Sequence, residues 1–513
     1  MRCLFTPFLI LTFSLLTFSQ SQDKSSDERW AAQNSLLSPH EMKEDLEIFL
    51  EIRENVNSGL FIYRTKKEID SIYNLAFEKI KKPMVFSEFF KIIIELTDFE
   101  GSLHNYTEPG TDFMEFLKEQ NSFFPYHLKQ INGKMIFDGH HDKITPGATI
   151  LSINGVKSTE LMQSFFKYFP VDGHSETYKL TASVEQIFRW RYFIEFGLAD
   201  EYIVEYTEPG SEKIMRATLP AVSFEDYEDN LKKKYSAPVS DKLDFRKQSA
   251  YSFEMLRPNA GLLNIRCFCM ATGIDDPAFE VYVSFIDSVF NVLDQNKIPN
   301  LIIDVRNNPG GSDPTFEQPV MYLSDENFKE NLEAHIIFDP DNIPYEDHFW
   351  GVSTTERIDS LTLATGRDFI KDYFYEFKDG KSYQNFKYNP VYHPKSPAYK
   401  GKVYLLINEN VASAASHFAS LVKAYARDVT IVGVETVGGY YDHNGHISLV
   451  YELPNSEIKT KFSVVYVVHD APLLPDQPKG RGIMPHYEIW PTLEDFLAHR
   501  DTQMEFILEL IND

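Results

Sequence analysis

Ser413 lies where a predicted strand turns into a predicted helix, in the segment Val411-Ala412-Ser413-Ala414-Ala415. The alanine side chains around it are too small to cover its hydroxyl, so an extended peptide backbone has room to approach. A serine hydroxyl in such a place is suited to nucleophilic attack on a carbonyl carbon. The alternative is structural, because serine is also a common N-cap residue at the start of a helix.

A second strand end supplies possible hydrogen-bond donors for the same chemistry. The apolar run that begins at Leu301 ends in Asn307-Asn308-Pro309-Gly310-Gly311, and paired glycines leave backbone N–H groups uncovered. In α/β sheets, sites form outside the carboxyl ends of the strands, so this turn is expected to meet Ser413. The backbone N–H of Ala414, at the start of the helix, is a second expected donor. A nucleophile beside an oxyanion hole predicts acyl transfer.

The rest of the chain divides into three regions that must position these residues. Helical periodicity favours three antiparallel helices early in residues 36–120, which we interpret as an N-terminal helical domain. Short strands with turn signals predict a compact β-rich binding module over residues 124–223. Strands and helices alternate over residues 245–513, which predicts an α/β core domain that ends in one long helix at residues 492–511. The sequence thus predicts a multidomain α/β protein.

Composition and charge restrict the cellular setting. The net charge of −26, with no basic run, argues against nucleic acid or an anionic membrane surface as a partner. Residues 1–22 have one arginine, an apolar run and a polar end, which predicts a signal peptide and a secreted or periplasmic protein; an uncleaved N-terminal anchor is the alternative. No other stretch is apolar enough to predict a membrane span. Cys267 and Cys269 are expected to be buried thiols, because a disulfide between them would be strained.

Four motifs occur in the order found in the C-terminal processing, or tail-specific, serine peptidases: "LIIDVRNNPGGS", "LLINENVASAASHFASLVK", "VGVETVGGYY" and "GRGIMPHYEIWPTLEDFL". The resemblance covers nearly all of the chain after the signal peptide, and it is to a tricorn-core-like branch with a helical N-terminal domain. It implies a PDZ-like module over residues 124–223 and a crotonase- and ClpP-like serine peptidase core. It also implies that Ser413 is the nucleophile, and that Ala414 with Gly310 or Gly311 forms the oxyanion hole. Such chemistry requires no metal and no organic cofactor.

The general base departs from the better-known pattern of this family. Many members activate the serine with a lysine in a Gly-Lys-Gly turn, whereas the matching stretch here, "ETVGGYYDHNGH", has no lysine. The tricorn-type branch uses a histidine that precedes the substrate module, and His104 has that position. We expect His104 to be the base, because an imidazole near neutral pKa suits serine activation. The alternatives are that His104 is a surface-loop residue, or that His443 or His446 acts instead.

The acid that would orient the imidazole has no clear match. Tricorn-type enzymes take a glutamate from near the last motif, where this chain has Lys479, so Glu100 and Asp442 are the candidates. Two further positions also depart from the family: Ser416 replaces a common glutamate, and Pro485-His486 replaces a common Pro-Asp pair. These changes indicate either altered specificity or a decaying active site.

The expected function is an exported serine endopeptidase that cleaves unfolded or C-terminal peptide segments through an acyl-enzyme at Ser413. The alternative is an inactive homologue that binds peptides or assists cell-envelope assembly. A third interpretation, a carbohydrate-handling enzyme with paired carboxylates, has no motif to support it. The expected partner is a peptide or an unfolded protein, and the sequence predicts no particular oligomeric state.

Overall fold

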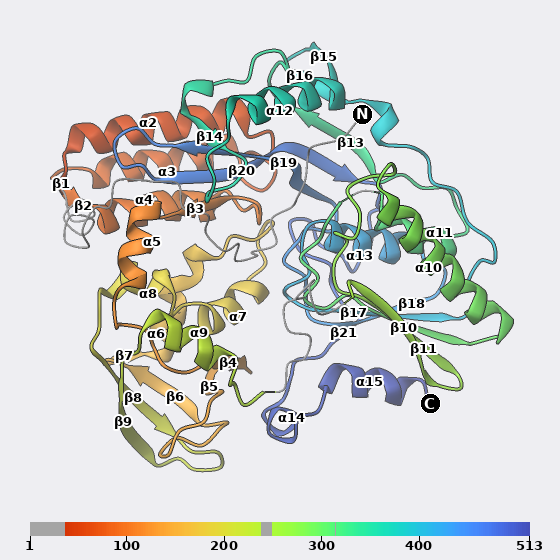
Figure 1. Ribbon diagram of the computed structural model, residues 1–513, viewed down its shortest axis with the longest axis horizontal. Coiled ribbons are helices and arrows are strands. Elements are labelled where there is room, and N and C mark those ends of the chain that lie inside the picture. Colours follow the sequence, from red (N-terminus) through yellow and green to blue (C-terminus); the bar gives the residue numbers. More distant parts are fainter. Residues whose placement is uncertain (1–35, 237–248, 313, 513) are drawn as a thin grey trace.

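The computed structural model describes residues 36–236 and 249–512 except residue 313, so the predicted signal peptide at 1–22 lies outside the described residues. Within the described ranges, helices and several sheets form one α/β assembly (Figure 1). Over these same ranges, none of the helices has the length and apolar character that a membrane crossing needs.

Three helices open the described chain, as the periodicity predicted: α2 (Pro39–Val56), α3 (Lys66–Lys79) and α4 (Phe86–Phe99). Ser38 caps α2 in a capping box with Glu41, which satisfies N–H groups at the start of that helix. Strand β1 (Leu36–Leu37), which precedes α2, pairs antiparallel with β2 (Met84–Val85), which precedes α4. The short helix α5 (Thr111–Lys118) then leads into the β-rich region.

The region between residues 124 and 223 contains an antiparallel sheet with strand order β4-β5-β6-β8-β9. Its hydrophobic core is continuous with that of the N-terminal helices, since Phe49 and Phe90 belong to the same cluster as Ile153 and Leu219. The two regions are therefore packed into one body. The elements are β4 (Leu128–Ile131), β5 (Lys134–Phe137), β6 (Thr149–Ile153), β7 (Val156–Lys157, paired with β6), α6 (Ser158–Phe165), η1 (Phe166–Tyr168), α7 (Thr177–Glu185), α8 (Trp190–Phe196), β8 (Glu201–Thr207), β9 (Ile214–Pro220) and α9 (Phe224–Leu231).

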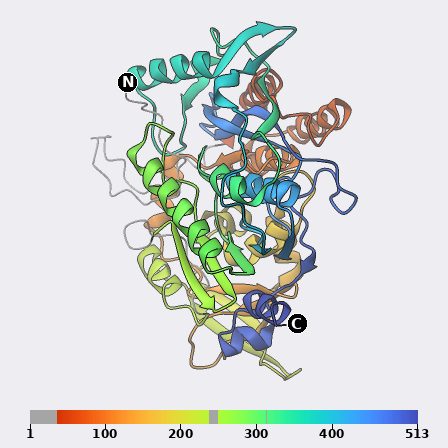
Figure 2. The same ribbon diagram turned by 90° about the vertical axis from the view of Figure 1, so that its right-hand side faces the viewer.

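The C-terminal part contains a six-stranded sheet of order β10-β11-β12-β17-β18-β21, parallel from β11 to β21. Alternate residues of its central strand face different layers: Leu301 and Ile303 pack with α10 and α13, whereas Ile302 packs with α15. Figure 2 shows α10 beside β10 and β11. The elements are β10 (Tyr251–Arg257), β11 (Ala260–Ile265), α10 (Pro277–Gln295), β12 (Asn300–Asp304), α11 (Glu317–Leu323), β17 (Lys402–Ile407), α13 (Ala414–Tyr425), β18 (Val429–Gly433), β21 (Tyr487–Glu488), α14 (Leu493–Ala498) and α15 (Thr502–Leu510).

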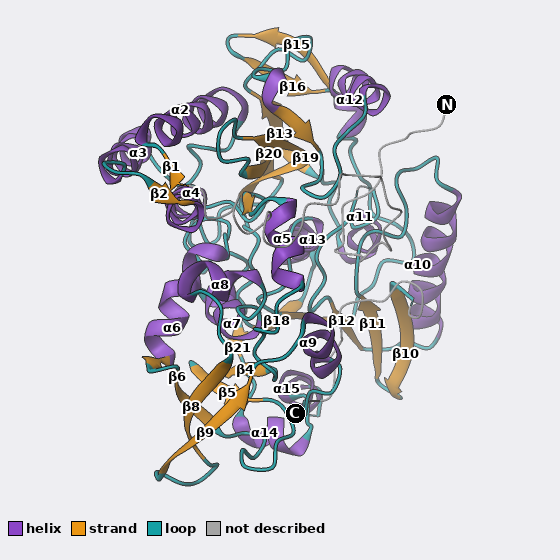
Figure 3. Cartoon of the chain, turned by 60° about the vertical axis from the view of Figure 1, so that its left-hand side comes forward, coloured by secondary structure: helices purple, strands orange, loops and turns teal. Residues whose placement is uncertain are grey.

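A second sheet, of order β14-β19-β20-β13-β16-β15, is built around a long hairpin. Strand β3 (Tyr106–Glu108) joins it by pairing with β20, so a segment from the N-terminal part enters a C-terminal sheet. Figure 3 shows β15 and β16 projecting at one end, beside α12. The elements are β13 (Asn331–Ile336), η2 (Glu346–His348), β14 (Phe349–Gly351), α12 (Ser360–Tyr373), β15 (Phe374–Lys378), β16 (Lys381–Gln384), η3 (Phe386–Tyr388), β19 (Asp442–Glu452) and β20 (Lys459–His469).

Two local predictions were wrong. The terminal helix predicted over 492–511 is divided into α14 and α15, because His499 adopts a left-handed backbone conformation with φ of 53° and ends the first helix. Cys267 and Cys269 were expected to be separate thiols, whereas the structure joins them in a disulfide.

A serine and a histidine at the meeting point of two sheets

Ser413 stands at the end of the turn that leads from β17 into α13. Its backbone has φ of 51° and ψ of −130°, a conformation that residues other than glycine rarely adopt and that costs of order 1–3 kcal/mol. Its side chain makes no capping hydrogen bond to α13, so the N-cap interpretation does not account for it. The strained turn instead directs the hydroxyl toward another part of the chain.

That part is His104, whose Nε2 lies 3.2 Å from Ser413 Oγ. His104 is buried in the turn between α4 and β3. Burial, chiefly, and the nearby Lys461 and His446 lower the pKa of His104 to about 3, while a hydrogen bond with the backbone of Asn444 acts in the opposite direction. The imidazole is therefore neutral at pH 7, and its Nε2 is placed to accept the proton of the serine.

Two contacts from distant segments hold the His104 turn against the core. Strand β3 follows it directly, and its Tyr106 pairs with Lys461 of β20. The buried carboxylate of Asp172 accepts the Leu103 N–H at 2.9 Å through Oδ1 and the Gly439 N–H at 3.0 Å through Oδ2. Asp172 thereby connects the residue before His104 to the loop between β18 and β19. Sequence reasoning missed this residue, because no motif marks a carboxylate that acts through backbone groups.

Burial also perturbs the titration of Asp172. Desolvation, opposed by the two N–H groups and assisted by the charge of Asp442, raises the pKa of its carboxyl from the usual 3.8 to about 7. The Asp172 carboxyl therefore takes up a proton near neutral pH. Its hydrogen bonds to the Leu103 and Gly439 N–H groups are weaker when it is protonated.

The predicted oxyanion turn reaches Ser413. Gly310 has φ of +105°, and a Cβ added there would lie 2.7 Å from the Ser413 Cβ and 3.0 Å from the Ala414 nitrogen. Glycine is therefore required for this approach. The Gly310 N–H, however, already donates to Asn308 Oδ1 at 2.9 Å. Gly311, which packs against the backbone of Phe268, and Ala414 are consequently the better candidates for oxyanion donors.

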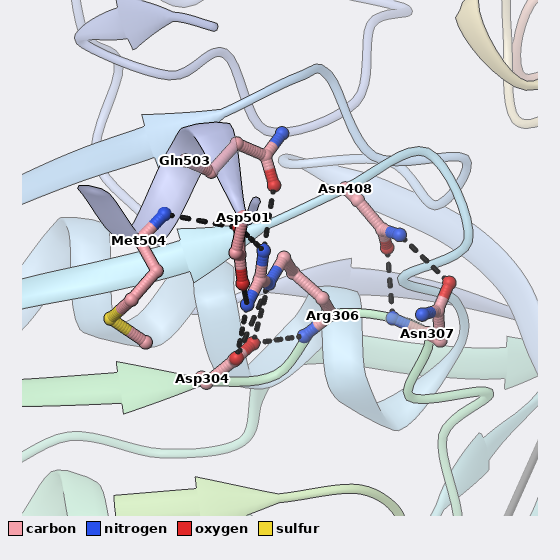
Figure 4. Close-up of polar contacts among 7 residues, drawn as sticks. All are labelled: Asp304, Arg306, Asn307, Asn408, Asp501, Gln503 and Met504. Atoms are coloured by element: carbon pink, nitrogen blue, oxygen red, sulfur yellow. Dashed lines mark hydrogen bonds and ion pairs between the residues drawn. The ribbon is translucent and has the colours of Figure 1, made fainter. Parts of the chain in front are cut away.

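Side-chain contacts hold the turn after β12 and the turn before Ser413 in place (Figure 4). Asn408, before the Ser413 turn, accepts the Asn307 N–H at 2.8 Å and donates to Asn307 Oδ1 at 2.8 Å. Arg306 pairs with Asp304 and with Asp501 at the start of α15, each at 2.7 Å. These contacts attach the oxyanion turn to the serine turn and to the C-terminal helix.

The other candidate residues contact different partners. The carboxylate of Glu100 is buried, lies 3.2 Å from Arg53 Nε and accepts hydrogen bonds from Tyr73 and Asn105. At Asp442 the backbone carbonyl accepts the Tyr63 hydroxyl at 2.9 Å, and burial raises the pKa of the carboxyl.

The loop histidines lie near the pair and contact other side chains. The His443 ring centroid is 5.9 Å from that of His104, and its Nδ1 lies 2.6 Å from His469 Nε2. His446 contacts Tyr373 and Glu330. At the position where the family commonly has glutamate, Ser416 donates its hydroxyl to the Ser413 carbonyl oxygen.

Comparison with known proteins finds one matching family model and several solved structures of similar fold. Residues 353–489 match the model of Peptidase family S41. Mature CPAF complexed with lactacystin is 15% identical over 91% of this chain and 97% of its own, with a TM-score of 0.56. A mutant of CPAF is 14% identical over 90% and 95%, with a TM-score of 0.59, and mature CPAF alone is 16% identical over 91% and 96%, with a TM-score of 0.53. These likenesses show a shared fold.

No curated protein matches the chain. The family match lies over the core that carries Ser413, and the fold match extends through nearly the whole length of both chains. The family match over residues 353–489, which include Ser413, makes this chain a serine-type peptidase whose core resembles Peptidase family S41.

Proposed function

We propose that this protein is an exported endopeptidase that cleaves unfolded or C-terminal peptide segments with Ser413 as nucleophile and His104 as general base. The observation that carries the proposal is the 3.2 Å contact between His104 Nε2 and Ser413 Oγ, made by a serine in a strained turn. An inactive peptide-binding homologue would have little need for either feature.

In the proposed reaction, Ser413 Oγ attacks the peptide carbonyl carbon while His104 Nε2 takes the hydroxyl proton. The N–H groups of Ala414 and Gly311 would stabilise the oxyanion that forms. The protonated imidazole then gives its proton to the leaving amine, and an acyl-enzyme results. Water, deprotonated by His104, releases the acyl group and restores the serine.

The sheet of residues 124–223 is the proposed substrate module. We infer that it acts in a PDZ-like manner, with an extended peptide pairing along an exposed strand edge before it reaches Ser413. The proposed secreted or periplasmic location rests on the signal-peptide pattern of residues 1–22.

Covalent labelling tests the nucleophile. A fluorophosphonate probe is expected to label the wild-type protein on the peptide that contains Ser413, and the Ser413→Ala variant should not be labelled. Ser420→Ala is the matched control, because Ser420 is a buried serine of the same helix whose hydroxyl donates to the Tyr440 carbonyl. Absence of labelling in folded wild-type protein would favour the peptide-binding homologue instead.

Asp172→Asn is expected to change the pH dependence of hydrolysis. His104 titrates far below neutrality, so the acid limb of wild-type kcat/KM should follow Asp172, with a midpoint near pH 7. The asparagine side chain has an NH2 group in place of one of the two oxygens that accept these N–H groups. The loss of that acceptor should lower kcat about tenfold at pH 8 with KM little changed. The limb itself should disappear between pH 5 and 8. A limb that persists in the variant would contradict a role for Asp172.

Stability gives an independent check of the same carboxyl group. The pKa of the Asp172 carboxyl is about 7 in the folded protein and near the usual 3.8 in the unfolded chain. The folded protein therefore binds this proton more tightly than the unfolded chain does. Its contribution to the free energy of unfolding is therefore full below about pH 4 and is lost as pH rises to about 7.

Asp45→Asn is the matched control for the pH dependence of hydrolysis, because Asp45 is also buried and accepts the N–H groups of Asn455 and Ser456. That variant should retain the acid limb of activity.

A further inference from the structure

Three buried histidines from different elements meet behind the catalytic pair. His417 lies on α13, His443 on β19 and His469 at the end of β20. One ligand-type nitrogen from each ring lies within 4.8 Å of the other two. Polar rings are costly to bury together without a ligand or a complete set of partners, so this cluster requires an explanation.

The hydrogen bonds at the outer side of the cluster fix the tautomers of two rings. His417 Nε2 lies 2.6 Å from the Glu330 carbonyl oxygen, so Nε2 carries the proton and Nδ1 has the lone pair. His469 Nδ1 lies 2.7 Å from the Tyr440 carbonyl oxygen, so its lone pair is on Nε2. Backbone carbonyls that accept the outer N–H of a histidine are the usual second contacts of metal-binding imidazoles.

The third ring completes the set after a proton moves within it. His443 Nδ1 donates its proton to His469 Nε2 across 2.6 Å. A bound cation would take the place of that proton between the two nitrogens. His443 would then carry its proton on Nε2, so the ring stays neutral and no net proton is released.

We propose that His417, His443 and His469 form a binding site for one divalent transition metal ion, with Zn²⁺ the expected occupant. Three imidazole nitrogens suit zinc, and a fourth position would be left for water. For Zn–N bonds of about 2.0–2.1 Å, the ligand nitrogens must lie about 3.3 Å apart. The His443–His469 pair must therefore separate, and the stacked rings of His417 and His469, with centroids 3.8 Å apart, must rotate.

The location gives the ion a structural role and no part in the serine chemistry. His417 follows Ser413 by one helical turn, and His443 precedes Asn444, whose backbone bonds to the His104 imidazole. A bound ion would join the nucleophile's helix to the strand that orients the base. Glu330 lies beside the cluster, because its backbone carbonyl contacts His417 and its Oε1 lies 3.4 Å from His446 Nε2.

Metal retention tests the site without any assay of peptidase activity. Wild-type protein, stripped with a chelator and then given one equivalent of Zn²⁺, is expected to keep about one zinc per chain through gel filtration. Its Tm should rise by about 2 °C or more. His417→Gln and His469→Gln should each weaken zinc binding more than about 100-fold and abolish that rise. His335→Gln is the matched control, because His335 is buried on β13 outside the cluster.

A second measurement uses only the wild-type protein, so it does not depend on whether the variants fold. Zinc-edge X-ray absorption of the wild-type protein should show three imidazole ligands. Three outcomes would overturn the site: no zinc retained by the wild type, equal retention by the cluster variants, or a spectrum dominated by sulfur or carboxylate ligands.

Discussion

Replacing His104 with alanine is expected to lower kcat/KM for an unfolded substrate such as casein by about 10⁴-fold or more. The neutral imidazole 3.2 Å from Ser413 Oγ is the group placed to take the serine proton, and a serine hydroxyl without a base is a weak nucleophile. Steady-state hydrolysis at pH 8, with circular dichroism as the check on folding, measures the effect. Added imidazole should restore part of the rate, because alanine leaves a space where the ring was.

His446→Ala is the control for this variant, since His446 belongs to the loop that offered the rival base and contacts Tyr373 instead of the serine. It should retain most of the activity. Survival of hydrolysis in His104→Ala together with its loss in His446→Ala would move the base to that loop.

Replacing Arg53 with alanine is expected to reduce the free energy of unfolding by about 3–5 kcal/mol. Arg53 is fully buried, pairs with Glu100 at 3.2 Å, donates to Thr460 at 2.7 Å and lies 4.2 Å from the Phe462 ring centroid. Its loss leaves the Glu100 carboxylate buried without the guanidinium, at the end of the helix that leads to His104. Urea unfolding followed by circular dichroism provides the measurement.

The double variant Arg53→Ala with Glu100→Gln separates pairing from packing. It should recover about 0.5–3 kcal/mol relative to the sum of the single changes, because the uncompensated charge is gone. Glu100→Gln alone should change stability more than kcat. A large fall in kcat with unchanged stability would instead make Glu100 part of the catalytic machinery, acting through Asn105.

Local sequence patterns predicted most elements near the site. Continuous apolar runs predicted β12 and β17, and helical periodicity predicted α10 and α13. The position of Ser413 at a strand–helix junction was visible because small residues surround it. His104 came from the family resemblance, since no local pattern distinguishes a base from a loop histidine.

What the sequence could not predict depends on contacts between distant segments. Asp172 acts on backbone N–H groups 69 and 267 positions away, and such acceptors leave no mark in a sequence. The pairing of β3 with β20 is equally hidden, because three residues are too short a strand to show a period. The break at His499 depends on one left-handed residue that carries no glycine signal.

The pairing of β3 with β20 has a consequence for when proteolysis can begin. It brings together a histidine and a serine that are 309 positions apart, so the pair is complete only after the last third of the chain has folded onto the first. A copy that is still being translated therefore has not yet brought His104 and Ser413 together. The order of chain completion therefore delays the proposed peptidase activity until these two segments have paired.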